Sequence, residues 1–317
     1  MGGHVSAPLV TVALCTHNHL DRLRLTLAAL QTLAGPPQGW ELLLVDNASS
    51  DGTAEYLATQ KWRPHGPAVR VVREAKLGLS NARNCAIAQA AGEYLLFIDD
   101  DETPHPQWLV SHAAAMVEHR PDALGGPIDV QFVDGDQPAW LQDELLGFIG
   151  KLDHGGQGGW LTDAKTPIFG GNFAFRRAVF EQIGNFDAGL GRLGAANIGG
   201  EDIEIYDRLL QRNCSVRWVP DALIYHRVES PKLKRGYFLD LHYRQGRTEG
   251  ARMRGRALRL PPRYVFAQFN RAVWRALSRR RESGADKSLR SEMNAVYFLG
   301  QIAGWIFGSR QVVKEKS

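Results

Sequence analysis

The stretch Tyr94-Leu-Leu-Phe-Ile-Asp-Asp-Asp-Glu-Thr103 is the most informative part of the sequence, because an apolar run leads directly into consecutive carboxylates. The apolar part has the length of a buried strand, and Asp99, Asp100 and Asp101 follow it. Carboxylates this close repel one another unless they are protonated or neutralised, and a divalent cation that prefers oxygen ligands neutralises them. Ligands of open α/β sheets bind beyond the carboxyl ends of the strands. The stretch therefore predicts a ligand or metal site, although an acidic turn that caps the next helix is an alternative.

Around this stretch, apolar runs of strand length alternate with segments of helical periodicity. Such strand and helix units in a row predict a mostly parallel, doubly wound α/β sheet. Strands that are apolar throughout indicate burial on both faces. The units cover residues 9–15 and 20–33, 41–46 with a helix from 53, 69–72 and 79–91, and 94–98 and 106–119.

The regular alternation weakens after Asp122. Residues 155–160 are rich in glycine and predict a mobile loop. Regular structure is expected again at 168–175, in a helix over 202–211 and in strands over 215–219 and 222–225. The ordered core is expected to end near His226.

Length and composition indicate a globular protein with one large domain, or one domain with an appendage: 317 residues, 44% of them hydrophobic. The widely spaced Cys15, Cys85 and Cys214 are expected to be core residues in a reducing compartment. Residues 1–8 do not resemble a secretory leader, and no stretch approaches the roughly 20 apolar residues of a membrane span. These features predict a cytoplasmic location.

The net charge of +4 conceals an uneven distribution. Residues 227–281 hold sixteen Lys and Arg against three acids, a balance of +13 that leaves −9 for the remainder. Residues 295–308 are then apolar at helical spacing and predict an amphipathic helix that includes Trp305, Ile306 and Phe307. We therefore expect a basic helical C-terminal extension over 227–317.

Two motifs in the first half of the chain place polar groups where a ligand could meet them. Asp46 ends the second predicted strand and could accept hydrogen bonds from a ribose or a base, but its neighbours also suit a plain turn. Arg83 lies near a helix start and could bind phosphate, or could be an ordinary surface arginine.

Three motifs in the second half can likewise be interpreted either as functional or as structural. Gly170-Gly171-Asn172 follows a predicted strand and allows a close approach of ligand to backbone, although a β-bulge would look identical. Glu201 and Asp202 begin a helix, where acids are common stabilisers and where an ionised general base could also lie. His226 could be a structural histidine or could complete a metal site with the upstream aspartates.

Taken in order, these segments resemble the family-two, GT-A-fold nucleotide-sugar glycosyltransferases over about residues 9–226. That fold has a Rossmann-like mixed sheet flanked by helices. The resemblance implies a nucleotide-binding half at 1–101 and an acceptor-binding half at 102–226, followed by the extension. The matching motifs are Val-Ala-Leu-Cys-Thr-His-Asn18, Val-Asp-Asn-Ala-Ser-Ser-Asp-Gly52, Gly-Leu-Ser-Asn-Ala-Arg-Asn84, Ile-Asp-Asp-Asp101, Gly-Gly-Asn-Phe-Ala-Phe-Arg176 with Gly184-Asn-Phe-Asp187, Glu201-Asp202, and residues 220–226.

The resemblance also implies roles for the matching residues. Asp202 would be the general base that deprotonates an acceptor hydroxyl, with inversion at the anomeric carbon. Mg²⁺ or Mn²⁺ would bridge the diphosphate and stabilise it as a leaving group. The nucleotide-binding residues would be Thr16, Asn18, Asp46, Arg83, Asp99 and Asp100; the metal ligands Asp99, Asp101 and His226; and the residues that meet the donor or acceptor sugar Gly170, Gly171, Asn172 and Glu201.

The expected partners follow from the same resemblance. The donor would be a sugar linked to UDP, dTDP or GDP, and the acceptor a glycan or lipid-linked molecule in cell-surface polysaccharide synthesis. The basic extension suggests peripheral contact with an anionic membrane at its cytoplasmic face. One departure is Asn47, which stands where many relatives have a second acid.

Two rival functions fit parts of the sequence. A phosphatase of the haloacid dehalogenase class would use Asp99 as a covalent nucleophile and Asp101 as an acid-base, but that nucleophile normally follows the first strand. A nucleic-acid-binding module would use the basic extension with its interleaved aromatic residues. We prefer membrane contact and expect no nucleic acid.

Overall fold

The computed structural model describes residues 7–63, 66–193, 196–198, 200–254 and 260–307. The chain divides into two compact units. The N-terminal unit comprises residues 1–131 and 150–227, and the C-terminal unit comprises residues 132–149 and 228–317.

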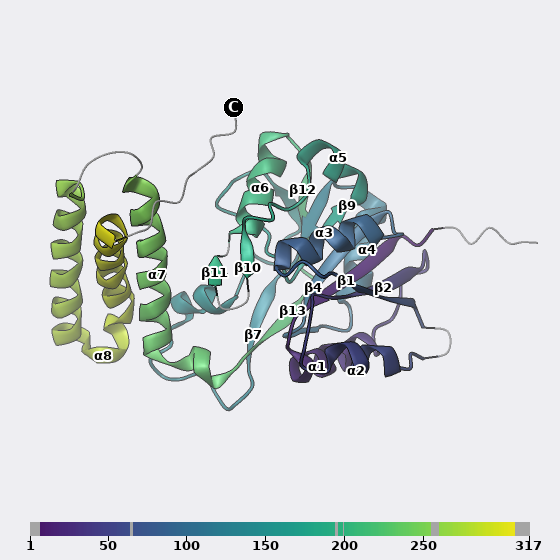
Figure 1. Cartoon of the computed structure of the whole chain (residues 1–317), viewed down its shortest axis with the longest axis horizontal. Helices are drawn as coiled ribbons and strands as arrows, with labels where there is room; N and C mark the ends of the chain where they lie inside the picture. Colours follow the sequence, from purple (N-terminus) through teal and green to yellow (C-terminus); the bar gives the residue numbers. More distant parts are fainter. Residues whose placement is uncertain (1–6, 64–65, 194–195, 199, 255–259, 308–317) are drawn as a thin grey trace, which may run out of the picture. The chain divides into compact units, whose positions relative to one another are not determined.

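The N-terminal unit is built from strands and helices around one large sheet (Figure 1). Its strands are β1 (Val10–Thr16), β2 (Trp40–Asp46), β3 (Ala68–Arg73), β4 (Tyr94–Asp99), β5 (Glu102–Pro104), β6 (Ala123–Gly125), β7 (Ile128–Phe132), β8 (Gly159–Leu161), β9 (Phe173–Arg176), β10 (Gly191–Leu193), β11 (Ala196–Ile198), β12 (Val216–Trp218) and β13 (Ile224–Val228). Its helices are α1 (Leu20–Leu30), α2 (Thr53–Thr59), α3 (Leu79–Gln89), α4 (Trp108–His119), α5 (Phe180–Ile183) and α6 (Glu201–Gln211), with the 3₁₀ turn η2 (Arg177–Val179).

The large sheet has eight strands in the order β3-β2-β1-β4-β9-β6-β12-β8. The first four are parallel, and β9 runs antiparallel to both of its neighbours, so the expected mixed α/β sheet is confirmed. One face packs against α1, α2 and α4, and the other against α3, α5 and α6. A smaller sheet of β5, β13 and β7 lies beside it in the fold.

Burial explains why the first strands and helices were readable from sequence. All seven residues of β1 are buried, as an interior parallel strand requires. In α1 the leucines at 23, 27 and 30 are buried at helical spacing. Cys15 and Cys214 are buried and Cys85 is partly buried, and all three are free thiols.

Three local expectations differ from the structure. Of residues 168–175 only the last three lie in a strand, because 170–172 form a tight loop before β9. The loop expected at 155–160 contributes its end to β8, which pairs with β12. The strand expected at 222–225 runs on to Val228, so His226 lies within β13 rather than at its end.

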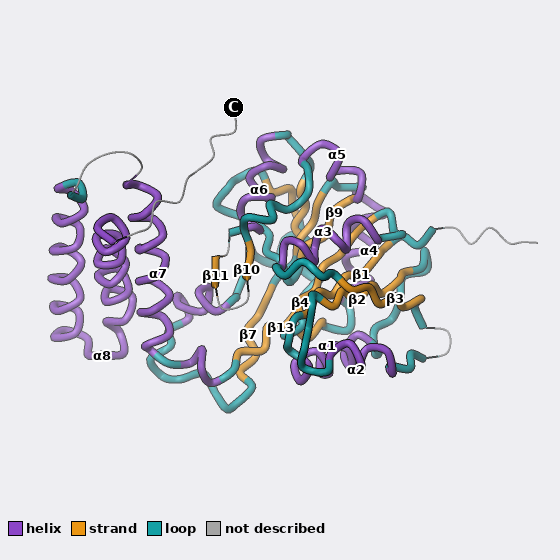
Figure 2. The backbone as a smooth tube through the Cα atoms, in the orientation of Figure 1, coloured by secondary structure: helices purple, strands orange, loops and turns teal. Residues whose placement is uncertain are grey.

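The chain beyond His226 is helical, as expected for the C-terminal extension. The C-terminal unit contains η1 (Asp143–Ile149), η3 (Ser230–Leu233), α7 (Arg235–Arg254) and α8 (Arg263–Phe307). Figure 2 shows α8 as two helical segments, which meet at Gly284 with a left-handed φ of 78°. The helix expected at 295–308 is the end of α8, except that Gly308 is outside the described residues. No helix in the described part of the chain is long and apolar enough to cross a bilayer.

No local pattern indicates that residues 132–149 belong with the C-terminal helices. This segment packs there through aromatic contacts. The Trp140 ring lies 5.5 Å from that of Phe238, and the Phe148 ring lies 4.7 Å from that of His242. Contacts between residues this far apart produce no periodic pattern in the local sequence, so they could not be predicted from it.

Glycines allow α7 and α8 to approach closely. A Cβ atom at Gly246 or Gly250 of α7 would lie 2.0 Å from a backbone oxygen of α8. A Cβ atom at Gly300 or Gly304 of α8 would lie 2.3 or 1.9 Å from a backbone oxygen of α7. The four-residue spacing on both helices therefore brings backbone against backbone.

Gly250→Ala is expected to destabilise the C-terminal unit by about 1–3 kcal/mol, because the added methyl group forces the helices apart. Hydrogen exchange of peptides from α7 and α8 would report this as faster exchange. Gly236→Ala is the matched control in the same helix, since a Cβ atom there meets nothing within 4 Å. Equal exchange in the two variants would contradict the close packing.

Candidate active site

The carboxyl ends of three neighbouring parallel strands bring polar residues to one edge of the sheet. Thr16 at the end of β1 is in register with Asp46 at the end of β2. The preceding residue, Cys15, is in register with Asp99 at the end of β4. Residues far apart in sequence thus meet at the edge where α/β sheets bind ligands.

An open cavity of about 250 Å³ lies at this edge. Four residues that were expected to bind nucleotide line it, together with Asp101. The complete lining is Cys15, Thr16, His17, Asn18, His19, Asn47, Leu77, Leu79, Ala82, Asp99, Asp100 and Asp101.

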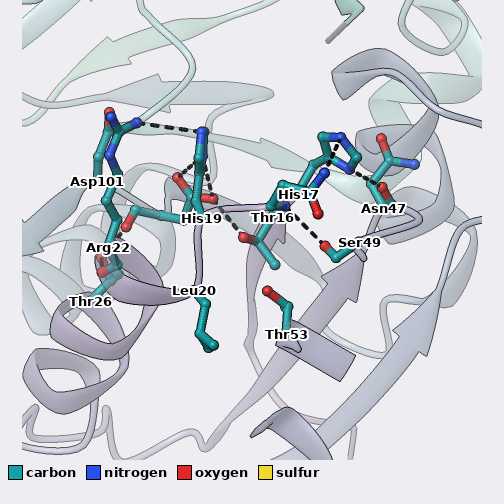
Figure 3. A network of polar contacts seen from close by, with 12 residues as sticks. Thr16, His17, His19, Leu20, Arg22, Thr26, Asn47, Ser49, Thr53 and Asp101 are labelled. Atoms are coloured by element: carbon teal, nitrogen blue, oxygen red, sulfur yellow. Dashed lines mark hydrogen bonds and ion pairs between the residues drawn. The ribbon is translucent and has the colours of Figure 1, made fainter. Parts of the chain in front are cut away.

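Asp100 is held by the turn that follows β1. Its Oδ2 accepts a hydrogen bond from the Thr16 hydroxyl at 2.6 Å, and His19 Nδ1 lies 3.2 Å from both carboxylate oxygens. Figure 3 shows Thr16 and His19 extending from this turn. The hydrogen bond to Asp100 raises the pKa of His19 above its ordinary value. His19 was missed by the sequence analysis, although it lies next to a motif residue.

Asn18 stabilises the same turn. Its φ of 53° is left-handed, a conformation that asparagine tolerates better than most residues. Its Oδ1 accepts a hydrogen bond from the Ser50 backbone N–H at 2.7 Å, and its own N–H donates to Ser49 Oγ at 3.1 Å. The turn after β1 is thereby joined to the turn after β2.

Asp46 is buried, and its two carboxylate oxygens differ. Oδ1 accepts a hydrogen bond from the Ser49 backbone N–H at 3.1 Å, whereas no described residue hydrogen-bonds to Oδ2. A buried polar oxygen without a partner is costly, so a ligand donor there would be favourable. The neighbouring Asn47 instead holds the chain after β3, since it donates to the carbonyls of Glu74 and Lys76.

Arg227 fixes the backbone of the acidic loop and was not foreseen. Its guanidinium donates to the carbonyl oxygens of Asp100 at 3.0 Å and of Glu102 at 2.9 Å. It also donates to the Thr26 hydroxyl and to the Arg22 carbonyl, both at 2.8 Å. The planar, multi-donor guanidinium thus ties the loop to α1 and β13.

Glu102 is a second unforeseen residue. It is buried, and Oε2 accepts a hydrogen bond from the Asp99 backbone N–H at 2.8 Å. Burial, and then the charges of Asp99 and Asp101, raises the pKa of Glu102 well above its ordinary value. Its carboxylate lies so close to Gly171 that a Cβ atom there would be 1.6 Å from Oε1. Gly171 therefore makes room for Glu102.

Two of the three expected metal ligands lie close together. β13 pairs with β5 so that His226 is opposite Glu102, and His226 Nε2 is then 3.8 Å from Asp101 Oδ2. Ligands of one Mg²⁺ or Mn²⁺ ion, with bonds of about 2.1 Å, lie about 3–4 Å apart, so this pair fits. The described residues contain no preformed group of three such ligands, so Asp99 as the third ligand stays a prediction.

Arg83 lies at the centre of a group of carboxylates. Its Nη1 donates to Asp202 Oδ1 at 2.6 Å and to Glu201 Oε1 at 3.3 Å, and its Nη2 lies 3.5 Å from Asp99 Oδ1. Burial opposes its charge, but the carboxylates, Asp202 foremost, outweigh this and raise the pKa of Arg83. It is 1% exposed, and its guanidinium lies over the Phe173 ring at 5.2 Å. The structure thus shows Arg83 as a buried counter-ion and not as an ordinary surface arginine, and its contact with a phosphate stays a prediction.

Asp202 lies in the first turn of α6 and is held on both carboxylate oxygens. Oδ2 accepts a hydrogen bond from the Gly170 backbone N–H at 3.0 Å, and Oδ1 accepts the bond from Arg83. Its side chain remains 22% exposed, so a substrate could still reach it. Gly170 permits this arrangement, because a Cβ atom there would lie 2.1 Å from Arg83 Nη2. The preceding Gly199 is outside the described residues.

Asn172 does not meet a sugar as expected, because it is fully buried with every hydrogen bond satisfied. Oδ1 accepts from Trp108 Nε1 at 2.8 Å and lies 2.9 Å from His112 Nε2. Nδ2 donates to the carbonyls of Pro127 and Ala222. The role of Asn172 is therefore to join the loop before β9 to α4 and to the chain before β13.

The same cluster predicts a pH dependence of stability. Burial lowers the pKa of His112 to about 4, against a smaller opposing effect of the bond to Asn172. An unfolded histidine titrates near 6.5, so the unfolded chain gains a proton first as the pH falls. The stability contributed by neutral His112 is complete above about pH 6.5 and is lost as the pH falls towards 4, by about 2 kcal/mol at pH 5.

Urea unfolding between pH 7.5 and 5 would measure this effect. His112→Gln retains a donor for Asn172 but does not titrate, so its stability is expected to fall less over this range than that of the wild-type protein. Parallel curves for the two proteins would contradict a neutral, buried His112.

Two protein-family profiles match the chain. The sequence profile of glycosyl transferase family 2 matches residues 11–184, and that of the N-terminal domain of galactosyltransferase matches residues 162–232. The chain is 27% identical over 240 residues to glycosyltransferase AglE of Haloferax volcanii, covering 76% of this chain and 72% of that protein. It is 26% identical over 137 residues to a glucosyl-dolichyl phosphate glucuronosyltransferase of the same organism, covering 43% of this chain and 42% of that protein.

Among solved structures, the fold resembles that of mannosyltransferase PcManGT from Pyrobaculum calidifontis in complex with GDP-Man and Mn²⁺. The TM-score is 0.60 at 17% identity, over 96% of this chain and 88% of that one. The family 2 match covers more than half of the chain and decides against the phosphatase reading of Asp99. The chain therefore belongs to glycosyl transferase family 2 and has a GT-A-type fold.

Proposed function

We propose that this protein is an inverting, metal-dependent transferase that moves a hexosyl or deoxyhexosyl group from a nucleotide diphosphate to an acceptor hydroxyl. The observation that carries the proposal is the position of Arg83, which contacts Asp99 at the cavity and Asp202 at the start of α6. One buried cation thus links a carboxylate that would face the donor to a carboxylate that would face the acceptor.

On the donor side, the cavity lined by Thr16, Asn18, Asp99 and Asp100 would hold the nucleoside diphosphate. The unpartnered Oδ2 of Asp46 suits a hydroxyl or N–H donor of the nucleoside. Asp101 and His226 would hold Mg²⁺ or Mn²⁺, which when bound offsets the charge of the departing diphosphate. The GDP-Man and Mn²⁺ of the structurally similar mannosyltransferase support this assignment.

On the acceptor side, Asp202 would act as the general base. Its carboxylate would take the proton from the acceptor hydroxyl while that oxygen bonds to the anomeric carbon and the bond to the diphosphate breaks. The Gly170 N–H and Arg83 hold the carboxylate in one orientation, so little reorganisation is needed. Attack from the face opposite the diphosphate inverts the anomeric configuration.

We also propose a glycan or lipid-linked acceptor in cell-surface polysaccharide synthesis, and peripheral contact with an anionic membrane at its cytoplasmic face. The glucosyl-dolichyl phosphate named for one relative supports a lipid-linked acceptor. The basic composition of residues 227–281 supports the membrane contact.

A thermal-shift experiment tests the proposal with UDP, dTDP, GDP, ADP and CMP, each with and without Mn²⁺. One diphosphate is expected to raise the Tm only with metal present, and this shift should vanish in Asp101→Ala. Asp129→Ala, which removes a surface carboxylate paired with Lys151, is the matched control and should keep the shift. A wild-type protein that no nucleotide stabilises would refute the proposed donor site.

A further inference from the structure

The first segment of α8 combines concentrated positive charge with exposed apolar side chains. Residues 263–281 contain six arginines and no acid, and all six arginines are exposed. In the same segment Trp274 is 70% exposed, Leu277 59% and Phe266 40%. Large apolar side chains gathered on an exposed helix mark an interaction surface more often than a solvated one.

These apolar side chains share one side of the helix. At about 100° per residue, Phe266, Trp274 and Leu277 fall within an arc of about 80°. The residues that pack inward, Val265, Ala272 and Ala276, are centred more than about 100° away from that row. The exposed row is therefore a second apolar face and not the edge of the core.

Arginines frame this row. Arg263 and Arg281 lie at its two ends and project at about the same angle as the apolar side chains. Glu292 lies 3.8 Å from Arg280, and Glu282, which follows Arg281 directly, projects about 100° away from it on the helix. Residues 263–282 carry six arginines against this one acid, so the row lies in a strongly cationic segment that suits an anionic partner.

The last turns of α8 fit a partner less well than the sequence suggested. Trp305, expected to be a membrane anchor, is only 6% exposed because it packs within the C-terminal unit. Phe307 is exposed, but the residues beside it in α8 include no arginine. At this end, within the described residues, a single arginine, Arg254 of α7, reaches the Ile306 carbonyl beside Phe307, whereas the first segment of α8 combines the three exposed apolar side chains of the row with six exposed arginines.

We propose that this docking face, formed by Phe266, Trp274 and Leu277 between Arg263 and Arg281, binds the surface of an anionic lipid bilayer. The inference rests on the proposed membrane contact and names the surface that makes it. Tryptophan and phenylalanine enter the interfacial region of a bilayer, while arginines bind headgroup phosphates. A helix with apolar and arginine-rich positions side by side suits such an interface, whereas a protein partner would not require so strong a cationic excess.

Liposome flotation of the full chain tests this inference, with vesicles of phosphatidylcholine alone or mixed with phosphatidylglycerol. The wild-type protein is expected to float with the anionic vesicles, and less so at high salt. The double variant Trp274→Ser with Leu277→Ser should lower the partition coefficient about tenfold or more. Arg263→Gln with Arg281→Gln should reduce binding to anionic vesicles and leave the weak binding to neutral vesicles unchanged.

The matched control is Leu25→Ser with Val117→Ser, which removes two exposed apolar side chains from the N-terminal unit and should float like the wild-type protein. Equal flotation of the Trp274 and Leu277 variant and the wild-type protein would overturn the docking face. Wild-type protein that fails to float, that forms a dimer which this variant disrupts, or that prefers duplex DNA to vesicles would overturn it as well.

The nucleotide thermal shift on the same samples separates this inference from the proposed transferase. All variants are expected to keep the wild-type shift, because the docking face lies outside the N-terminal unit. Flotation that depends on the face, without any nucleotide shift, would leave membrane docking standing and refute the donor site. A nucleotide-dependent rise in Tm without flotation would leave the donor site standing and refute membrane docking.

Discussion

Asp202→Asn is expected to lower kcat for sugar transfer by about 10²- to 10⁴-fold, because an amide cannot take the proton of the acceptor hydroxyl. The Gly170 N–H and Arg83 Nη1 bonds go to different carboxylate oxygens, and the amide group has an oxygen at only one of these two positions. Release of nucleoside diphosphate from the donor, measured with acceptor present, would give kcat. Nucleotide affinity is expected to change little, since Asp202 does not line the cavity.

Asp207→Asn is the matched control, because it makes the same chemical change later in α6. We expect it to retain the wild-type kcat. If Asp202→Asn kept more than a tenth of the wild-type kcat, another residue would have to be the base. If it lost nucleotide binding as well, its effect would be structural rather than catalytic.

Arg83→Met is expected to lower the free energy of unfolding by about 3–5 kcal/mol, because it leaves carboxylates close together without their counter-ion. Asp99, Glu201 and Asp202 all lie within 3.5 Å of the Arg83 guanidinium nitrogens. Methionine fills a similar volume against the Phe173 ring, so lost packing contributes less than lost charge. Urea unfolding at neutral pH would measure the change.

Arg176→Met provides the comparison, because Arg176 is a partly exposed arginine paired with Asp122. Removing it should cost about 1 kcal/mol, as expected for a pair near solvent. Equal losses in the two variants would mean that Arg83 acts through packing rather than as a counter-ion. Arg83→Lys should recover part of the stability, since it restores the charge but not the forked geometry.

The site combines an open cavity, proposed to bind the nucleotide-sugar donor, with residues that hold the cavity lining in place. Thr16 and His19 hold Asp100, and Arg227 holds the backbone around it. Glycines at 170 and 171 give room for Arg83 and Glu102. Such a framework restricts the motion of the residues proposed to act, which is what orientation-based catalysis requires.

Local sequence was enough to locate the first four strands, most of the helices of the N-terminal unit and the edge of the sheet where the site lies. Periodicity located the first four strands: β1, β2 and β4 are apolar runs that are buried on assembly, whereas β3, at the edge of the sheet, is partly exposed. Chain order then placed Thr16, Asp46 and Asp99 at strand ends, and parallel pairing makes those ends neighbours. The family motifs predicted the other site residues, including Asp202, which lies at the start of a helix.

Which of these polar residues line the cavity, and which hold the lining residues in place, depends on the tertiary structure. Arg227 meets Thr26, which lies 201 residues away, and Arg83 meets Asp202, which lies 119 residues away. Asn172 is indistinguishable in sequence from a sugar ligand, yet four hydrogen bonds within the protein satisfy its buried side chain. Local sequence fixes backbone propensity and the spacing of apolar residues, but hydrogen-bond partners and burial depend on which distant segments the folded chain brings together.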